Sequence, residues 1–195
     1  MGKLIAQMQM SVDGRVSASD PSLSWQLWEW DENWDWDVDL KLVFNAIFAS
    51  IGAILLSRPM IEEGYLDHWT GTARRFEHDP SYDFARRIVE VPKIVLTDKL
   101  SVSRWERTTI ARGGIPSAIE RLKSESTDDI ITFGGTGFVS TLIASGVVDE
   151  LQLFINPVAV GNGGSIFADR DSIALRLLQS DSFSCGMVVN RYALG

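Results

Sequence analysis

The sequence offers little material for disulfide or metal chemistry. It contains one cysteine, Cys185, and two histidines, His68 and His78. A single cysteine excludes an internal disulfide framework, and the apolar residues that follow Cys185 predict that it is simply buried. The histidines stand in polar, loop-like sequence with no His-x-x-x-His pair, so we expect no metal site.

Long apolar runs and basic stretches are also missing. Residues 1–7 lack the apolar core of a signal peptide, and the longest apolar stretch, 47–56, is too short to span a bilayer. These absences predict a soluble cytoplasmic protein that does not bind membranes. The net charge is −8, with 18 basic and 26 acidic residues, so the sequence lacks the basic stripe that a nucleic-acid partner would require.

Acidic residues and tryptophans are concentrated in residues 16–40, which we call the Trp-acid segment. It holds seven acids, no lysine or arginine, and five of the seven tryptophans, which are Trp25, Trp28, Trp30, Trp34 and Trp36. We expect one or two of these rings to face a pocket and the others to be structural. The acids would keep the segment soluble and would disfavour an anionic substrate.

Short apolar runs alternate with helical patterns along the chain. Strands are predicted at 3–10, 53–56, 93–97, 130–133 and 151–155, helices at 38–48, 116–123 and after Gly137, and two long strands within 173–194. This order predicts an α/β fold of three αβα layers, in which one mixed, mostly parallel sheet ends in antiparallel C-terminal strands. No repeat or long linker divides the chain, so we expect a single domain over residues 1–195.

The strongest local signal is the stretch Ile130 to Phe138, where a buried strand passes through glycines directly into a helix. The free N–H groups and the dipole at a helix start favour an anion such as phosphate. Alternatively, the glycines make only a tight turn. Neither common nucleotide motif fits, because Ser140 replaces the third Rossmann glycine and no GxxxxGK[ST] occurs.

Five segments, taken in order, carry more information than any one motif. They are 6–14 with the turn SVDG, 53–62, 92–97, 133–143, and the pair GVVDEL (146–151) and PVAVGNGGSIF (157–167). Together they resemble the dihydrofolate reductase-like superfamily, in particular the branch with the reductase domain of bacterial riboflavin biosynthesis. The last pair is long and specific, whereas the other segments are individually weak.

The resemblance implies an enzyme that uses NADPH to reduce a small planar heterocycle, pterin- or pyrimidine-like, or a related carbonyl or imine. Members of this branch often pair, so a homodimer is expected. The positions that would bind NADPH are Ala6 at the nicotinamide, Gly134, Gly135, Thr136, Gly137 and Phe138 at the diphosphate, and Ser57, Arg58, Leu96 and Thr97 toward the adenosine. Arg58 is the natural partner of a 2′-phosphate.

Hydride transfer usually requires a proton donor. By analogy with the folate-reducing members, Asp39 is the first candidate and Asp13 the second, although Asp39 also suits a helix start and Asp13 also suits a turn. Trp25 and Phe44 are the expected substrate contacts. Genuine folate reduction is less favoured, because Ser24-Trp25 stands where a Pro-Trp motif is expected.

Two departures from the family pattern leave other functions open. Ser57 replaces a glycine and Met60 replaces a threonine hydroxyl that would contact phosphate. Both changes weaken the expected cofactor cradle, so a non-catalytic ligand-binding descendant of the fold is the alternative. A third hypothesis makes the Trp-acid segment a protein-contact surface that involves Trp28 and Trp30.

Overall fold

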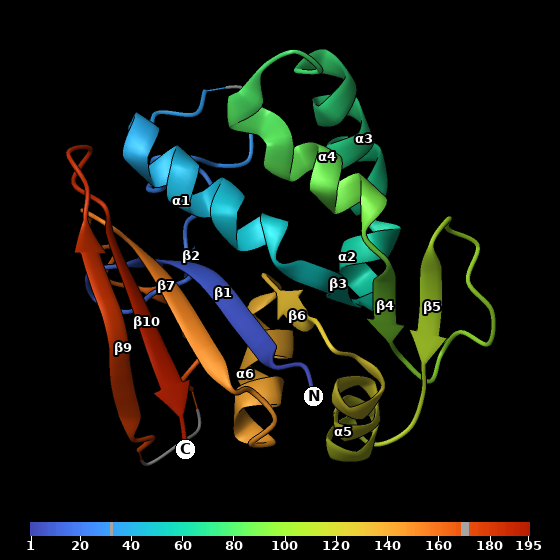
Figure 1. Cartoon of the computed structure of the whole chain (residues 1–195). Helices are drawn as coiled ribbons and strands as arrows, with labels where there is room; N and C mark the ends of the chain where they lie inside the picture. Colours follow the sequence, from blue (N-terminus) through green and yellow to red (C-terminus); the bar gives the residue numbers. More distant parts are fainter. Residues whose placement is uncertain (32, 169–171) are drawn as a thin grey trace.

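One eight-stranded sheet organises the computed structural model, which describes residues 1–31, 33–168 and 172–195 (Figure 1). Its strands are β1 (Leu4–Ser11), β3 (Ile51–Ser57), β4 (Lys93–Leu96), β5 (Thr108–Ala111), β6 (Asp129–Thr132), β7 (Glu150–Asn156), β9 (Leu175–Ser182) and β10 (Val188–Leu194). The spatial order is β5-β4-β3-β6-β1-β7-β10-β9. Neighbours from β5 to β7 run parallel, whereas β10 is antiparallel to both β7 and β9.

Helices cover both faces of this sheet. They are α1 (Val38–Ala49), α2 (Arg58–Glu62), α3 (Tyr65–Arg75), α4 (Asp83–Glu90), α5 (Ile115–Glu125) and α6 (Thr136–Ala144), with a 3-10 turn at Pro80–Tyr82. Helices α1, α3 and α4 lie on one face and α5 and α6 on the other (Figure 1). Two apolar cores result, one on each side of the sheet, because strand side chains alternate between faces. The predicted three-layer αβα fold with antiparallel C-terminal strands is confirmed.

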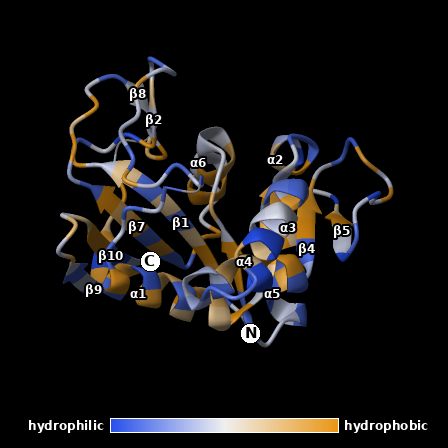
Figure 2. Cartoon of the chain, turned by 90° about the horizontal axis from the view of Figure 1, so that it is seen from above, coloured by the Kyte–Doolittle hydropathy of each residue, from blue (hydrophilic) through white to orange (hydrophobic). Residues whose placement is uncertain are grey.

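A two-stranded ribbon stands beside the main sheet. It pairs β2 (Ser17–Ala18) with β8 (Gly163–Gly164), which lies in the PVAVGNGGSIF segment (Figure 2). A side chain at Gly163 is impossible here, because its Cβ would lie 1.7 Å from the carbonyl oxygen of Ser17. The specific glycines of this segment therefore allow two backbones to approach closely near the start of α6.

The Trp-acid segment connects β1 to α1 and is anchored in the molecule by its tryptophans, whereas most of its other described residues are exposed. Trp28 stacks on Trp34 with ring centroids 4.4 Å apart, and Trp28, Trp34 and Trp36 are all buried. Gln9 Nε2 donates to the Trp28 carbonyl at 2.8 Å, while the Leu27 N–H donates to Asn156 Oδ1 at 2.8 Å. Because Trp28 is 1% exposed, it cannot form the predicted protein-contact surface. Glu32, one of the seven acids, lies outside the described residues.

Four smaller expectations need correction or comment. His68 lies in α3 rather than in a loop, because its polar neighbours form the outer face of an amphipathic helix. Cys185 is only half-buried, in the turn between β9 and β10. Among the described residues no cluster of three metal-ligating side chains occurs. No helix in the described ranges is long and apolar enough to cross a membrane.

Candidate functional site

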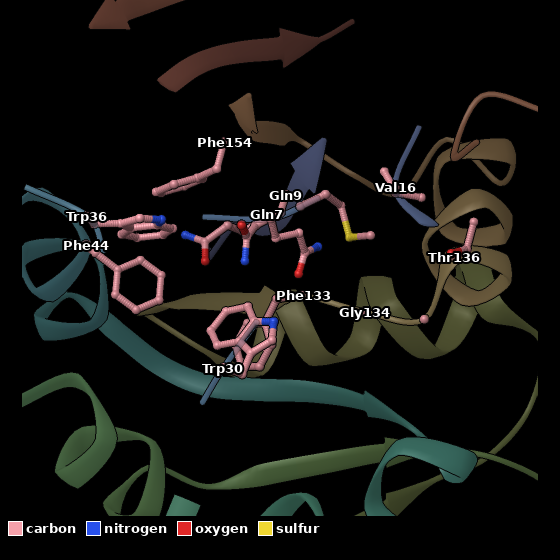
Figure 3. A pocket seen from close by; sticks show the side chains of 13 residues that line it. Gln7, Gln9, Val16, Trp30, Trp36, Phe44, Phe133, Gly134, Thr136 and Phe154 are labelled. Carbon is pink, nitrogen blue, oxygen red and sulfur yellow. The ribbon is translucent and has the colours of Figure 1, made fainter. Parts of the chain in front are cut away.

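A cavity of about 170 Å³, the inner cavity, opens where β1 and β6 separate. Their pairing ends at Ala6 and Thr132, and the next residue of β1, Gln7, lines the cavity. One end of the cavity is the turn Gly134–Thr136, and the other end is aromatic (Figure 3). Ala6 itself is fully buried between β6 and β7, so it borders the cavity without lining it.

The junction between β6 and α6 leaves hydrogen-bond donors free. Gly135 caps α6 without a side-chain bond, and the Val139 N–H donates to the Gly135 carbonyl at 3.0 Å. The N–H groups of Thr136, Gly137 and Phe138 come before that bond and find no acceptor in the described part of the chain. Gly135 and Gly137 are exposed, with open space where a Cβ would stand. This helix start can therefore accept an anion.

The junction between β3 and α2 lies on the same edge of the sheet but is occupied by its own side chains. Ser57 caps α2, its Oγ accepting from the Met60 N–H at 3.4 Å. Arg58 forms an ion pair with Glu62 one turn along the helix. The Met60 thioether lies beside Gly134, where a Cβ would meet it at 3.3 Å. Register pairs Ser57 with Leu96 on β4, which places Thr97 at the same edge.

The aromatic end of the inner cavity is built from three elements. Trp36 stacks on Phe154 of β7 at 5.4 Å and 15°, and it meets Phe44 of α1 edge-on at 5.4 Å. Gln7 and Gln9 approach from β1 between these rings and the glycine turn (Figure 3). The described lining of the cavity consists of amides, aromatic rings, glycines, two aliphatic side chains and the hydroxyl of Thr136, and it contains no ionisable side chain.

A second cavity of about 620 Å³, the outer cavity, lies on the other side of Trp30 and Phe133. Both rings line both cavities and stack with centroids 6.3 Å apart. Trp30 has φ 67°, a left-handed conformation that is strained for a bulky residue. The outer cavity carries Glu29, Glu63 and His68 among its lining residues. The Trp30–Phe133 pair therefore separates an uncharged chamber from one with ionisable groups.

The two candidate acids lie away from the described lining of both cavities. Asp39 is exposed in the first turn of α1, where it suits the helix dipole. Asp13 accepts from Ser11 Oγ and from the N–H groups of Val160 and Gly161, and these bonds lower its pKa to about 2. Asp13 thus holds the β8 loop as a carboxylate and has no proton to donate near neutral pH.

Other predicted residues divide into two groups. Gly134, Gly135, Thr136 and Phe44 line the inner cavity, whereas the half-buried Trp25 is absent from its described lining. Trp30 and Trp36 line the cavity in place of the expected Trp25. Gln7 and Gln9 were missed, although polar residues at alternate positions of a central apolar strand are a recognisable signal. Phe154 carried no signal, since a buried strand residue looks the same anywhere in a core.

Comparison with known proteins relates this chain to a protein family. The family model of the RibD C-terminal domain matches residues 2–189. An uncharacterised Bacillus subtilis protein, YyaP, is 22% identical over 187 residues, covering 95% of this chain and 92% of YyaP.

Solved structures show the same fold at low identity. A putative riboflavin biosynthesis protein from Shewanella sp. PV-4 superposes with a TM-score of 0.68 at 15% identity, covering 99% of both chains. Dihydrofolate reductase from Enterococcus faecalis, solved in complex with NADP(H), gives a TM-score of 0.56 at 15% identity, covering 100% of this chain and 97% of that one.

Proposed function

The chain belongs to the RibD C-terminal domain family, and on this basis we propose that it is an NADPH-dependent reductase of a small planar, pyrimidine-like heterocycle or a related carbonyl or imine. The observation that carries the proposal is the open start of α6 beside the inner cavity. Bound NADPH would supply a hydride. Residues of this chain would bind and orient the cofactor and the substrate.

The β6–α6 junction suits the diphosphate of the cofactor. Three backbone N–H groups that find no acceptor among the described residues lie at a helix start, and two exposed glycines leave room for close approach. From there the inner cavity leads past Gln7 toward Trp36, Phe44 and Phe154. A nicotinamide that enters from Gly134 and a substrate ring held by the aromatic end would meet in this space.

Arg58, Ser57, Leu96 and Thr97 remain the proposed contacts on the adenosine side. They gather on one edge of the sheet because β3 and β4 are parallel and in register. Arg58 would have to leave Glu62 to bind a 2′-phosphate. An exposed pair of this kind is worth about 0.2–1 kcal/mol, so a dianion can compete for it.

The proton that accompanies hydride transfer needs a source outside the described lining of the inner cavity, because that lining has no ionisable group. Water is one source, and the outer cavity offers Glu29, Glu63 and His68 behind the Trp30–Phe133 pair. Asp39 is therefore expected to be dispensable. Asp39→Asn should retain full activity with any substrate that the wild-type protein turns over.

The cheapest test is to titrate NADPH and excite tryptophan. Trp30 and Trp36 line the inner cavity, so bound nicotinamide should quench protein emission and emit by energy transfer. NADH titrated in parallel reports the contribution of the 2′-phosphate. Lack of energy transfer at millimolar NADPH would contradict cofactor binding.

The ligand-binding alternative keeps one specific observation in its favour. Met60 lies against Gly134, and the Ser57 hydroxyl caps α2 at the second junction. Ser57 and Met60 are the two positions where the family pattern is lost. Stoichiometric binding of pterins, flavin precursors or quinones without NADPH oxidation would favour this alternative. Turnover of any of them would exclude it.

A homodimer is the proposed assembly, by analogy with the branch alone. Sedimentation at micromolar concentration measures the mass directly. A monomer that binds NADPH would remove the dimer from the proposal and leave the reductase function intact.

A further inference from the structure

The outer cavity has mostly aromatic walls. Four rings line it, those of Trp30, Tyr65, Trp69 and Phe133, together with the thioether of Met60. Its volume of about 620 Å³ lies within the usual range of small-molecule sites, roughly 300–1,000 Å³. The outer cavity is therefore large enough for a small organic ligand.

The four rings stand in more than one orientation. Phe133 stacks with Trp30 at an interplanar angle of 28° and with Tyr65 at 30°, whereas Trp69 stands at 89° to Trp30. Walls that meet at a right angle present ring faces as well as ring edges to the space between them. Because the face of an aromatic ring carries negative charge density, such an arrangement attracts a cation.

The charged groups at the outer cavity are acidic. Glu29 of the Trp-acid segment and Glu63, which follows α2, both line the cavity and have exposed side chains. His68 of α3 is the other ionisable residue of the described lining, in which no lysine or arginine occurs. With a neutral imidazole, the described lining carries two negative charges and no positive one.

A neighbouring hollow extends this acidic surface along α3. It has a volume of about 490 Å³ and shares Trp30 and His68 with the outer cavity. Its lining adds Asp31, Asp67 and Arg75, so its acids outnumber its one described base. The hollow therefore does not offset the charge of the outer cavity, and the combined surface favours a cation over a phosphate or a carboxylate.

The rings and the carboxylates occupy different depths of the outer cavity. Trp69 is 3% exposed, whereas Glu29 and Glu63 are exposed, so the rings form the inner wall and the carboxylates form the rim. An ammonium group bound between them would lose water on the side of the rings and keep it on the side of the rim. This arrangement limits the desolvation cost that a buried cation would otherwise incur.

We propose that the outer cavity binds a small organic ammonium ion, quaternary or protonated, with its positive charge against the aromatic rings and toward Glu29 and Glu63. The site lies beyond the proposed reductase function and does not depend on it, because it is a different cavity from the one assigned to hydride transfer. It can be tested in the absence of NADPH.

The test compares three ligands of nearly the same shape and different charge. Choline is a cation, 3,3-dimethylbutan-1-ol is its neutral carbon analogue, and 3,3-dimethylbutanoate is an anion. Each gives one sharp methyl signal, so proton NMR can measure its binding to the wild-type protein at pH 8, where imidazole side chains are largely uncharged. Choline should bind about tenfold more tightly than the alcohol, and the anion should bind most weakly.

Trp30→Leu distinguishes an aromatic wall from a merely apolar one. The variant loses the ring but keeps an apolar side chain, so choline affinity should fall about fivefold while the affinity for the alcohol stays within about twofold. Thermal unfolding checks that the variant is folded. Equal losses for the two ligands would show that the cavity is only apolar and would overturn the proposal.

Glu63→Gln tests the charge without removing any wall. Choline affinity should fall about threefold, within the range of an exposed ion pair, with no change for the alcohol. Glu62→Gln is the matched control, because Glu62 is the neighbouring acid, is also exposed, and does not appear in the described lining of the cavity. It should leave choline affinity unchanged. Equal losses in the two variants would mean that only the net charge matters, which contradicts a site at the rings.

An NMR experiment on ¹⁵N-labelled protein locates the bound cation. Choline should shift the indole N–H signal of Trp30, identified by its absence in Trp30→Leu, more than that of Trp36. A larger shift at Trp36, which lines the inner cavity, would place choline in the other chamber and overturn the proposal. The proposal also fails if the anion binds more tightly than choline, or if choline does not bind at millimolar concentration.

Discussion

The two strand-to-helix junctions on one edge of the sheet differ in what they leave free. At β6–α6 the cap is Gly135, and three N–H groups lack acceptors within the part of the chain that the structure describes. At β3–α2 the cap is the Ser57 hydroxyl, Arg58 is paired with Glu62, and Met60 covers Gly134. The β6–α6 junction, which we call the open junction, therefore has donors available for an anion. At the β3–α2 junction, which we call the closed junction, the cap and the charged side chain already have partners within the chain.

This difference shows how the departures at Ser57 and Met60 can shift the affinity for a cofactor from one junction of the fold to the other. The open junction would supply most of the affinity for a diphosphate, because its donors gain partners only when a ligand is present. At the closed junction, the Arg58–Glu62 ion pair and the Ser57 cap must first be broken before these side chains can bind the cofactor. We therefore expect cofactor binding to depend strongly on α6 and weakly on α2.

The largest effect is expected from Gly135→Asp. Aspartate is a good N-cap and should raise stability by a few tenths of a kcal/mol. Its carboxylate would also bond the free N–H groups and repel the diphosphate, so NADPH affinity should fall about a hundredfold or more. Thermal unfolding and calorimetric NADPH titration measure the two opposite changes.

Ser57→Asp is the control for that variant. It places the same charge at the closed junction and keeps a good cap, so NADPH affinity should fall only a few-fold. Equal losses in the two variants would remove the distinction between the junctions.

A smaller effect, in the opposite direction, is expected from Glu62→Gln. Neutralising Glu62 frees Arg58 and should strengthen NADPH binding up to about fivefold, the value of an exposed ion pair, with no change for NADH. The ratio of the two dissociation constants is the measurement. A parallel change for NADH would mean that Arg58 does not contact the 2′-phosphate.

Met60→Thr tests the other half of the closed junction. Restoring a hydroxyl beside Gly134 should strengthen NADPH binding about twofold to threefold, which is roughly half of the usual contribution of one hydrogen bond. The loss of packing by the methionine side chain should lower the stability of the protein by about 1 kcal/mol. Met60→Ala, with the same lost packing and no hydroxyl, should not gain affinity. If both variants gain equally, the methionine acts only as an obstruction.

The smallest effect is expected from Asp13, whose carboxylate holds the loop that leads into β8, next to the open junction. Hydrogen bonds lower the Asp13 pKa to about 2, so its contribution to stability is present above an unfolded pKa near 3.8 and is lost as pH falls toward 2. Asp13→Asn should flatten the fall in melting temperature between pH 4 and 2. An unchanged slope would show that the slope comes from other carboxylates, such as Asp37, whose pKa is also about 2.

The fold was largely predictable because its strands and helices have clear periodic patterns. The strands around Ile54, Ile94 and Ile131 are continuous apolar runs, as expected of parallel strands buried on both faces. Helices α3 and α4 were missed, since their few apolar residues are spread through polar sequence. Strand β5 was missed because only four residues of it pair at the sheet edge.

The site was less predictable than the fold. The glycine turn could be found because its chemistry is local in the chain. Trp36, Phe154 and Gln7 meet only through tertiary packing, and nothing in the sequence separated Trp36 from Trp25. Asp39 was selected by analogy, and its exposed position on α1 depends on how Asp37 caps that helix.

Amide NMR tests the central claim most directly. NADPH added to ¹⁵N-labelled protein should shift the N–H signals of Thr136, Gly137 and Phe138 strongly, as charge-assisted hydrogen bonds form, and those of Arg58 and Met60 weakly. Large shifts confined to α2, with the α6 signals unmoved, would contradict the assignment of the open junction as the phosphate site.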